Sequence, residues 1–172
     1  MGVLTVFWKP LRERSRARAV KAIGIGEGPS EPDFSRFVQQ AAEAFAAPFA
    51  LLTLIERDSL WVKAAAGFEL RCMPREHSFC SHAVDRGDLL EVCDARADPI
   101  FAALPAVVGE PFVRYYLGAP LSLTDGTDIG ALCVLDDRPR QPASRDQKAY
   151  LAGLARQAIH ALERRAHVKG GL

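Results

Sequence analysis

Apolar residues that alternate along the chain predict a β-hairpin between Tyr115 and Asp136. Two mostly apolar runs flank the turn-forming cluster Thr124–Asp128, which contains an Asp-Gly pair. Gly126 can adopt the positive φ that a tight reversal needs, so the runs are predicted to pair as antiparallel strands. Apolar residues occupy both faces of these strands. We therefore expect the hairpin to be covered on both sides. Helices would form one covering layer, and the other layer could hold a ligand.

The alternation within this hairpin assigns residues to its two faces. Tyr115 and Tyr116 are the first two residues of the first strand, and their side chains are predicted to lie on its opposite faces. In the second strand, Ile129 and Cys133 are predicted to share one face and Leu132 to lie on the other. A shift of register by one residue would exchange the two tyrosines, so the pattern leaves open which of them faces a ligand.

A second hairpin is predicted upstream, where two apolar runs between Phe49 and Ala66 are separated by the polar turn Glu56–Ser59. Alternation places Val62 and Ala64 on one face of the returning strand and Trp61 on the other. Trp61 is interpreted as a core residue or a pocket wall, where its indole N–H needs a hydrogen-bond partner.

Helical spacing predicts two helices in the N-terminal part of the chain. Leu11–Ile23 is rich in arginine and is interpreted as an amphipathic helix with a solvated basic face. Ser30 and Asp33 resemble a capping box that opens a second helix. Its apolar stripe indicates a core-facing helix, which Pro48 is expected to end.

Two further helices are predicted by their caps. Ser78 is expected to begin a short helix that Gly87 ends, and Ser144 with Gln147 forms a capping box for a helix that runs to about Arg165. This last helix has enough apolar positions for one face on the sheet and a leftover seam. Such a seam is typical of a helical dimer interface.

Composition narrows the function. The chain has 172 residues and a formal net charge of +1, which fits one domain and gives no global attraction to nucleic acid or an anionic membrane. No apolar run approaches the ~20 residues of a membrane span, and the apolar start precedes its basic residues, unlike a secretion signal. We expect a cytoplasmic protein whose four cysteines are reduced.

Several segments together resemble a GAF domain of the bacterial type found in histidine kinases and cyclic-dinucleotide enzymes. The segments that carry the resemblance are Ser78-Phe79-Cys80, Val92–Ala95 with Asp98-Pro99, Tyr115–Leu121 and Gly130–Asp136. The resemblance implies an α+β, PAS-related fold with a central antiparallel sheet of about six strands. Terminal helices would cover one face, and loops and short helices would close a pocket on the other. The implied organisation is an N-terminal helix and linker (1–29), a GAF domain (30–165) and a C-terminal tail (166–172).

The resemblance also implies a regulatory sensor without catalytic residues of its own. We expect it to bind an unidentified small molecule, to dimerise through its terminal helices, and to act on a separate effector such as a kinase or cyclase. The Asn-Lys…Phe…Asp-Glu motif of cyclic-nucleotide-binding members is absent from the sequence. Ser81 follows Cys80 where bilin-binding members usually have histidine.

The expected pocket residues are aromatic or polar side chains near the central hairpin. They are Trp61, Phe79, Cys80, Cys93, Phe101, Tyr115 and Tyr116. Two alternatives stay open: these side chains fill the pocket in an interaction scaffold, or the protein is a thiol-dependent oxidoreductase of the free-methionine-sulfoxide-reductase type.

Cysteine and aspartate residues near the expected pocket allow sharper chemical interpretations. In the oxidoreductase alternative, Cys80 and Cys93 approach each other. The spacing of His77, Cys80, His82 and Cys93 is not a recurrent chelate pattern, and we expect no metal site. Asp94 and Asp98 are interpreted as caps of backbone N–H groups.

Overall fold

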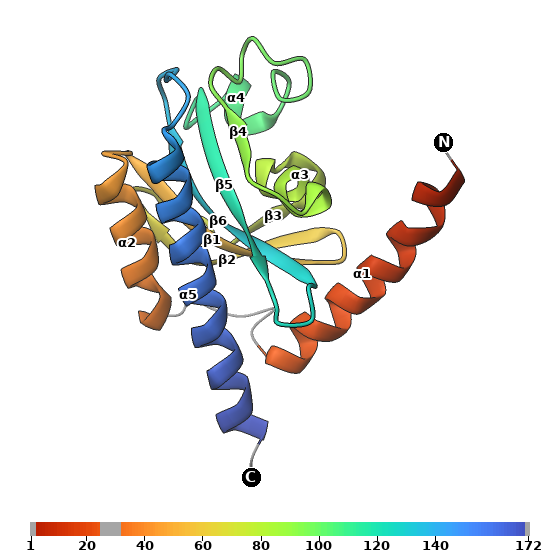
Figure 1. The fold of residues 1–172 in the computed structure, drawn as a ribbon. Coiled ribbons are helices and arrows are strands. Elements are labelled where there is room, and N and C mark those ends of the chain that lie inside the picture. Colours follow the sequence, from red (N-terminus) through yellow and green to blue (C-terminus); the bar gives the residue numbers. More distant parts are fainter. Residues whose placement is uncertain (1–2, 25–31, 171–172) are drawn as a thin grey trace.

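The computed structural model describes residues 3–24 and 32–170, with side chains described for 10–24 and 32–168. Helices occupy both ends of this part of the chain, and strands and short helices lie between them (Figure 1). In chain order the elements are α1 (Val3–Ile23), η1 (Pro32–Phe34), α2 (Ser35–Ala44), β1 (Phe49–Glu56), β2 (Ser59–Ala66), β3 (Cys72–Pro74), η2 (Arg75–His77), α3 (Phe79–Arg86), β4 (Leu90–Val92), α4 (Pro105–Val108), β5 (Tyr115–Ser122), β6 (Asp128–Asp136) and α5 (Arg145–Gly170).

Within the described residues, six strands form one sheet in the order β3-β2-β1-β6-β5-β4. Every neighbouring pair is antiparallel. The two predicted hairpins, β1–β2 and β5–β6, lie at the centre because β1 pairs with β6 and joins them. The predicted α+β architecture with about six strands is confirmed.

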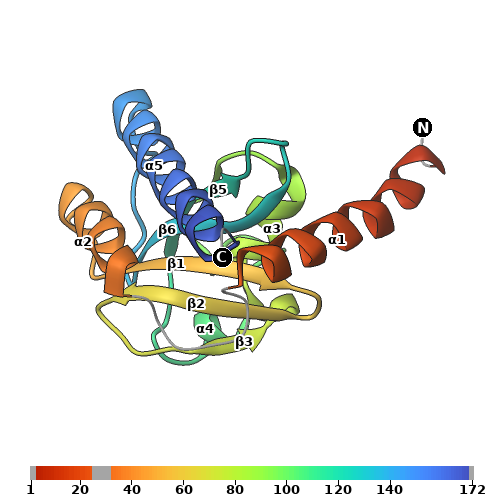
Figure 2. The same ribbon diagram turned by 90° about the horizontal axis from the view of Figure 1, so that it is seen from below.

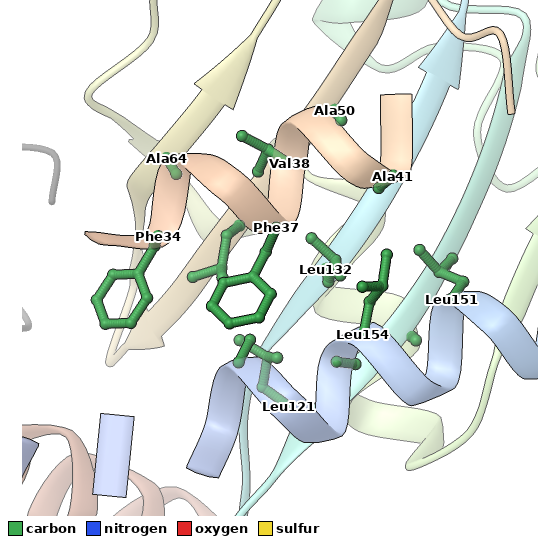
Figure 3. Packing of buried hydrophobic residues seen from close by; sticks show 14 of the residues in the cluster. Phe34, Phe37, Val38, Ala41, Ala50, Ala64, Leu121, Leu132, Leu151 and Leu154 are labelled. Atoms are coloured by element: carbon green, nitrogen blue, oxygen red, sulfur yellow. The ribbon is translucent and has the colours of Figure 1, made fainter. Parts of the chain in front are cut away.

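Helices α2 and α5 lie side by side on one face of this sheet (Figures 1 and 2). Their apolar stripes meet the sheet in a dense core, which we call the helix-side core; Figure 3 shows Phe37 of α2, Leu154 of α5 and Leu132 of β6 within it. The Ser144–Gln147 capping box forms as predicted. The Ser144 N–H donates to Gln147 Oε1 at 2.8 Å, and the Gln147 N–H donates to Ser144 Oγ at 3.1 Å.

Helix α1 contacts the body of the molecule through its C-terminal part, and its N-terminal part projects away (Figure 2). Val20 and Ile23 are buried in the helix-side core. Arg16 is also buried, and its Nε donates to the backbone carbonyl of Asp128 at 2.6 Å. The guanidinium thus fastens α1 to the turn of the β5–β6 hairpin.

The opposite face of the sheet is covered by α3, α4 and the long connection between β4 and β5, as predicted. Ser78 caps α3 by accepting the Ser81 N–H at 3.1 Å, and Gly87 ends the helix with a φ of 67°. Phe79, Phe101 and neighbouring apolar residues on this face form a second core, which we call the cavity-side core.

A β-bulge in β2 overturns one predicted face assignment. The pairing with β1 passes from Leu52–Ala64 directly to Thr53–Val62, so Lys63 is an extra residue on β2. An extra residue reverses the alternation beyond it. Val62 therefore packs in the cavity-side core and Ala64 in the helix-side core, and the prediction that they share a face is wrong.

A second bulge has the same effect on β6. The pairing passes from Leu121–Gly130 to Ser122–Asp128 and leaves Ile129 as the extra residue. Ile129 consequently packs in the helix-side core with Leu132, and its predicted place on the face of Cys133 is wrong.

Some helix ends differ from the expected ones. α1 begins at Val3, α2 ends at Ala44 before Pro48, and α5 continues past Arg165 to Gly170. The proposed cap at Ser30 lies outside the described residues. Among residues 3–24 and 32–170, no helix combines the length and apolarity needed to cross a membrane.

Candidate ligand-binding site

A cavity of about 400 Å³ lies between the sheet and the elements that cover its second face. Strands β1, β5 and β6 contribute Thr53, Tyr116 and Cys133 to its lining. Helix α3 contributes Phe79 and Cys80, and the segments around α4 and residues 68–73 complete the walls. The cavity therefore depends on two central strand pairs and on the loop-rich cover above them.

Aromatic rings form one wall of the cavity as a continuous stack. The Phe79 ring lies 5.0 Å from that of Tyr116 and 4.9 Å from that of Phe101, with interplanar angles of 14° in both cases. His82 meets Phe101 edge-on at 4.9 Å. Phe101 thus supports Phe79 from behind and is not itself part of the cavity lining. Stacked rings of this kind hold the wall in a fixed orientation.

The polar atoms at the floor of the cavity bind one another. The Tyr116 hydroxyl donates to Cys80 Sγ at 3.3 Å, and Cys80 Sγ lies 3.7 Å from Cys133 Sγ. Gly118 makes this arrangement possible, because a Cβ at that position would lie 2.1 Å from the Tyr116 hydroxyl. The glycine two residues along β5 gives the tyrosine ring its space on the strand surface.

The two buried thiols differ in acidity. The hydrogen bond from Cys133 lowers the pKa of Cys80 more than burial raises it, and the hydroxyl of Tyr116 adds to this lowering. Burial, together with the nearby Cys80, raises the pKa of Cys133. Burial likewise raises the pKa of Tyr116, so its hydroxyl remains a donor at neutral pH. Cys80 is therefore the thiol more readily ionised.

The rim of the cavity is acidic. Glu69 and Glu110 are exposed side chains in its lining, and His77 lies at the same opening. Among the described residues that line the cavity, none is lysine or arginine. The described lining of the cavity therefore contains two carboxylates and no basic side chain apart from His77.

The register of β5 settles the orientation of the two tyrosines. Tyr116 faces the cavity, and Tyr115 packs in the helix-side core, where its hydroxyl donates to Glu91 Oε1 at 2.9 Å. Burial and the neighbouring Glu91 raise the pKa of Tyr115. Of the predicted pocket residues, the structure brings Phe79, Cys80 and Tyr116 together at the cavity.

Two further predicted residues lie elsewhere. Cys93 packs against the helix-side core, and burial raises its pKa. Trp61 is half-buried on β2 opposite Cys72 of β3 and does not line the cavity. Cys80 packs in the cavity-side core and Cys93 against the helix-side core, so the structure does not bring together the pair that the oxidoreductase alternative needs; the thiol beside Cys80 is Cys133.

Sequence reasoning missed Cys133, Thr53 and Met73 as cavity residues. Cys133 could have been found from the register of the hairpin. Cys133 pairs with Gly118, and the Tyr116 side chain lies over Gly118. Met73 carried no such signal, because β3 follows a loop whose path the apolar pattern does not specify.

Other polar clusters serve the backbone. Asp94 accepts the Arg96 N–H at 3.1 Å and Asp98 accepts the Ile100 N–H at 2.9 Å, so their interpretation as caps is confirmed. Within the part of the chain that the structure describes, no group of three or more His, Cys, Asp or Glu side chains is arranged to hold a metal ion.

A central antiparallel sheet with helices on one face and a covered cavity on the other defines a regulatory small-molecule-binding fold. The GAF domain family model matches residues 31–162, and the chain belongs to this family. It is 37% identical over 147 residues to the cyclic di-GMP phosphodiesterase PA2567 of Pseudomonas aeruginosa. That match covers 86% of this chain and only 25% of the relative, so the chain spans about a quarter of that protein's length.

Solved structures share the fold at low sequence identity. A GAF domain of a phosphoenolpyruvate-protein phosphotransferase from Coxiella burnetii superposes with a TM-score of 0.67 at 18% identity, covering 94% of this chain and 98% of that one. The free methionine-R-sulfoxide reductase of Neisseria meningitidis superposes with a TM-score of 0.63 at 18% identity, covering 98% and 95%. At this identity the likeness shows the fold alone.

Proposed function

We propose that this GAF domain is a sensor module that binds a neutral or cationic, mostly apolar small molecule between the sheet and α3. The observation that carries the proposal is the cavity itself. Its volume of about 400 Å³ lies within the range of roughly 300–1,000 Å³ that is typical of small-molecule sites. Its walls are apolar and aromatic, with a few convergent polar atoms. A cavity of this size favours ligand binding over the alternative of a self-filled scaffold.

The charge of the opening narrows the class of ligand. Glu69 and Glu110 lie at the cavity and the described lining contains no lysine or arginine side chain. Phosphate-bearing ligands are usually bound by arginine, lysine or clustered backbone N–H groups. A nucleotide would therefore meet unfavourable charge here, whereas an amine or an uncharged ring system would not.

The likeness to PA2567 supports an effector in cyclic di-GMP turnover. Because the relative is named as a cyclic di-GMP phosphodiesterase and this chain matches a quarter of its length, we propose that the domain transmits ligand occupancy to a phosphodiesterase- or cyclase-type effector. The terminal helices α1 and α5 are the proposed dimerisation elements. Exposed Leu11 on α1 and Tyr150 on α5 supply apolar surface for such contacts.

The oxidoreductase alternative loses the pair on which it was based. It required Cys80 and Cys93 to approach each other, and they pack against different cores. The sensor remains the function that the geometry supports best.

The test is native mass spectrometry of the protein purified from its own host. We expect a retained small molecule, and we expect the substitution Ala106→Trp, which places an indole in the cavity lining, to abolish retention. Ala103→Trp is the matched control, because Ala103 is exposed on the same segment and does not line the cavity. Equal retention by both variants, or no retained molecule in the wild-type protein, contradicts the proposal.

A further inference from the structure

Cys80 and Cys133 form a buried thiol pair whose two side chains both reach the cavity. Cys80 lies on α3 and Cys133 on the central strand β6, so the pair bridges the cover and the sheet. We propose that this pair is a peroxide-reactive dithiol that closes to an intramolecular disulfide, which makes the cavity a site of oxidative modification. The inference goes beyond the proposed ligand sensing and does not depend on it.

The geometry suits bond formation. The two sulfur atoms are 3.7 Å apart and need to approach to the ~2.05 Å of a disulfide bond. A change of χ1 rotamer at either cysteine is the movement that would bring the two sulfur atoms together. Cys80 is the second residue of α3 and Cys133 lies on β6, so closure of the bond draws the first turn of the helix toward the sheet.

The two thiols are suited to different roles. Cys80 carries hydrogen bonds from Tyr116 and Cys133, and it lies in the first turn of α3, where the helix dipole favours a thiolate. Cys133 is completely buried in β6, which keeps it protonated. We assign Cys80 as the attacking thiolate and Cys133 as the resolving thiol.

The chemistry balances with a peroxide as the oxidant. The Cys80 thiolate attacks one peroxide oxygen, so that an S–O bond forms, the O–O bond breaks, and the departing oxygen takes up the proton released by Cys80. The Cys133 sulfur then attacks the sulfenic acid: the S–S bond forms, the S–O bond breaks, and hydroxide leaves as water with the proton of Cys133. Two thiols are oxidised by two electrons, and hydrogen peroxide is reduced to two molecules of water.

The cavity gives hydrogen peroxide a route to the two thiols, although both are buried. Its lining extends from the exposed rim residues Glu69 and Glu110 to both thiols, and hydrogen peroxide is small and uncharged. Closure of the disulfide ties α3 to β6 and removes the thiol acceptor of the Tyr116 hydroxyl. Oxidation thus alters the wall of the same cavity.

The test is treatment of the folded, reduced protein with hydrogen peroxide, followed by non-reducing peptide mapping. We expect a mass lower by two hydrogens, a cross-link between Cys80 and Cys133, and reversal by dithiothreitol. Cys72→Ser, at an exposed position on β3, is the control that leaves the cross-link intact. If Cys72 is oxidised while the Cys80 and Cys133 thiols stay reduced, the proposal is overturned.

Single variants separate the two roles. In Cys133→Ser, Cys80 should stop at the sulfenic acid and be trapped by dimedone; in Cys80→Ser, Cys133 should remain a thiol. Tyr116→Phe keeps the aromatic ring and should slow the oxidation several-fold by removing the hydroxyl donor. If dimedone labels Cys133 in the Cys80→Ser variant as strongly as it labels Cys80 in the Cys133→Ser variant, the assignment of Cys80 as the attacking thiolate is contradicted. Because the readout is a mapped bond in ligand-free protein, a failure here is distinguishable from a failure of the ligand-sensing proposal.

Discussion

The two faces of the sheet are built from the same strands and have different characters. The helix-side core is filled by aliphatic and phenyl side chains from α2, α5 and the sheet, as Figure 3 shows. The cavity-side core contains stacked rings, two thiols and an open volume of about 400 Å³. Adjacent Tyr115 and Tyr116 illustrate the contrast: one hydroxyl meets a carboxylate at the edge of the helix-side core, and the other meets a thiol in the cavity. One face stabilises the fold, and the other leaves room for chemistry.

The largest expected effect comes from truncation on the closely packed face. Leu132→Ala removes a fully buried side chain from the helix-side core and should destabilise the protein by ~2–5 kcal/mol. Leu135→Ala, on the same strand but in the cavity lining, should cost less, because Leu135 already borders open volume. Urea denaturation with unchanged m-values measures both. Equal losses would show that the two faces are packed alike.

A smaller effect is expected where a glycine shapes the cavity. Gly118→Ala puts a methyl group against the Tyr116 hydroxyl and should cost roughly 1–3 kcal/mol through displacement of the ring. In a Tyr116→Leu background the same substitution should cost less, because the ring that it displaces is gone. A double-mutant cycle from denaturation curves measures this coupling. Strict additivity would contradict the role assigned to Gly118.

The pH dependence of stability tests the polar edge of the helix-side core. Partial burial raises the pKa of Glu91. The Ala143 N–H, Lys148 and the Tyr115 hydroxyl together lower it by more than burial raises it, so its pKa lies below the ordinary 4.5. A carboxyl with a lowered folded-state pKa contributes stability above pH 4.5 that is lost as the pH falls through the folded-state value. Glu91→Gln should therefore reduce the slope of unfolding free energy against pH on the acid side.

The control for this pH dependence is Glu69→Gln at the cavity rim, where the carboxyl is exposed. A larger fall in the acid-side slope for Glu91→Gln than for Glu69→Gln assigns the effect to the hydrogen-bonded carboxyl of Glu91. If the slope in Glu91→Gln is the same as in the wild-type protein, the claim that folding lowers the pKa of Glu91 is contradicted.

The smallest expected effect is that of Tyr116→Phe on stability. The substitution keeps the stacked ring and removes one neutral hydrogen bond to a thiol, so the loss should be about 1 kcal/mol or less. Thermal denaturation, compared with Tyr115→Phe, measures it. Tyr115 donates to an ionised carboxylate, and its loss should be the larger. The reverse order would contradict the difference drawn between the two tyrosines.

The sequence was sufficient for the elements whose signals are local. The capping box at Ser144, the cap at Ser78 and the αL glycine Gly87 each act within one helical turn, and each predicted helix end formed there. The central hairpin followed from alternation and its Asp-Gly turn. The family resemblance supplied the sheet and the covered face.

What sequence reasoning missed depends on contacts between distant strands. The bulges at Lys63 and Ile129 arise from pairing with a neighbouring strand, and no local pattern marks the extra residue. The same long-range register decides that Tyr116 rather than Tyr115 faces the cavity and that Cys133 rather than Cys93 meets Cys80. Phe79, Cys80 and Tyr116 line the cavity as predicted, whereas Tyr115 and Cys93 pack on the helix side because the sequence left the face of each residue undetermined.

The most direct test of the difference between the faces is a methyl NMR titration with a small-molecule extract of the host. Leu51 and Leu135 line the cavity, and Leu132 lies on the other face of the same sheet. The account predicts that the Leu51 and Leu135 methyl resonances shift with saturation and that those of Leu132 stay in place. Saturable shifts confined to Leu132, or no saturable shift at any of the three residues, would contradict it.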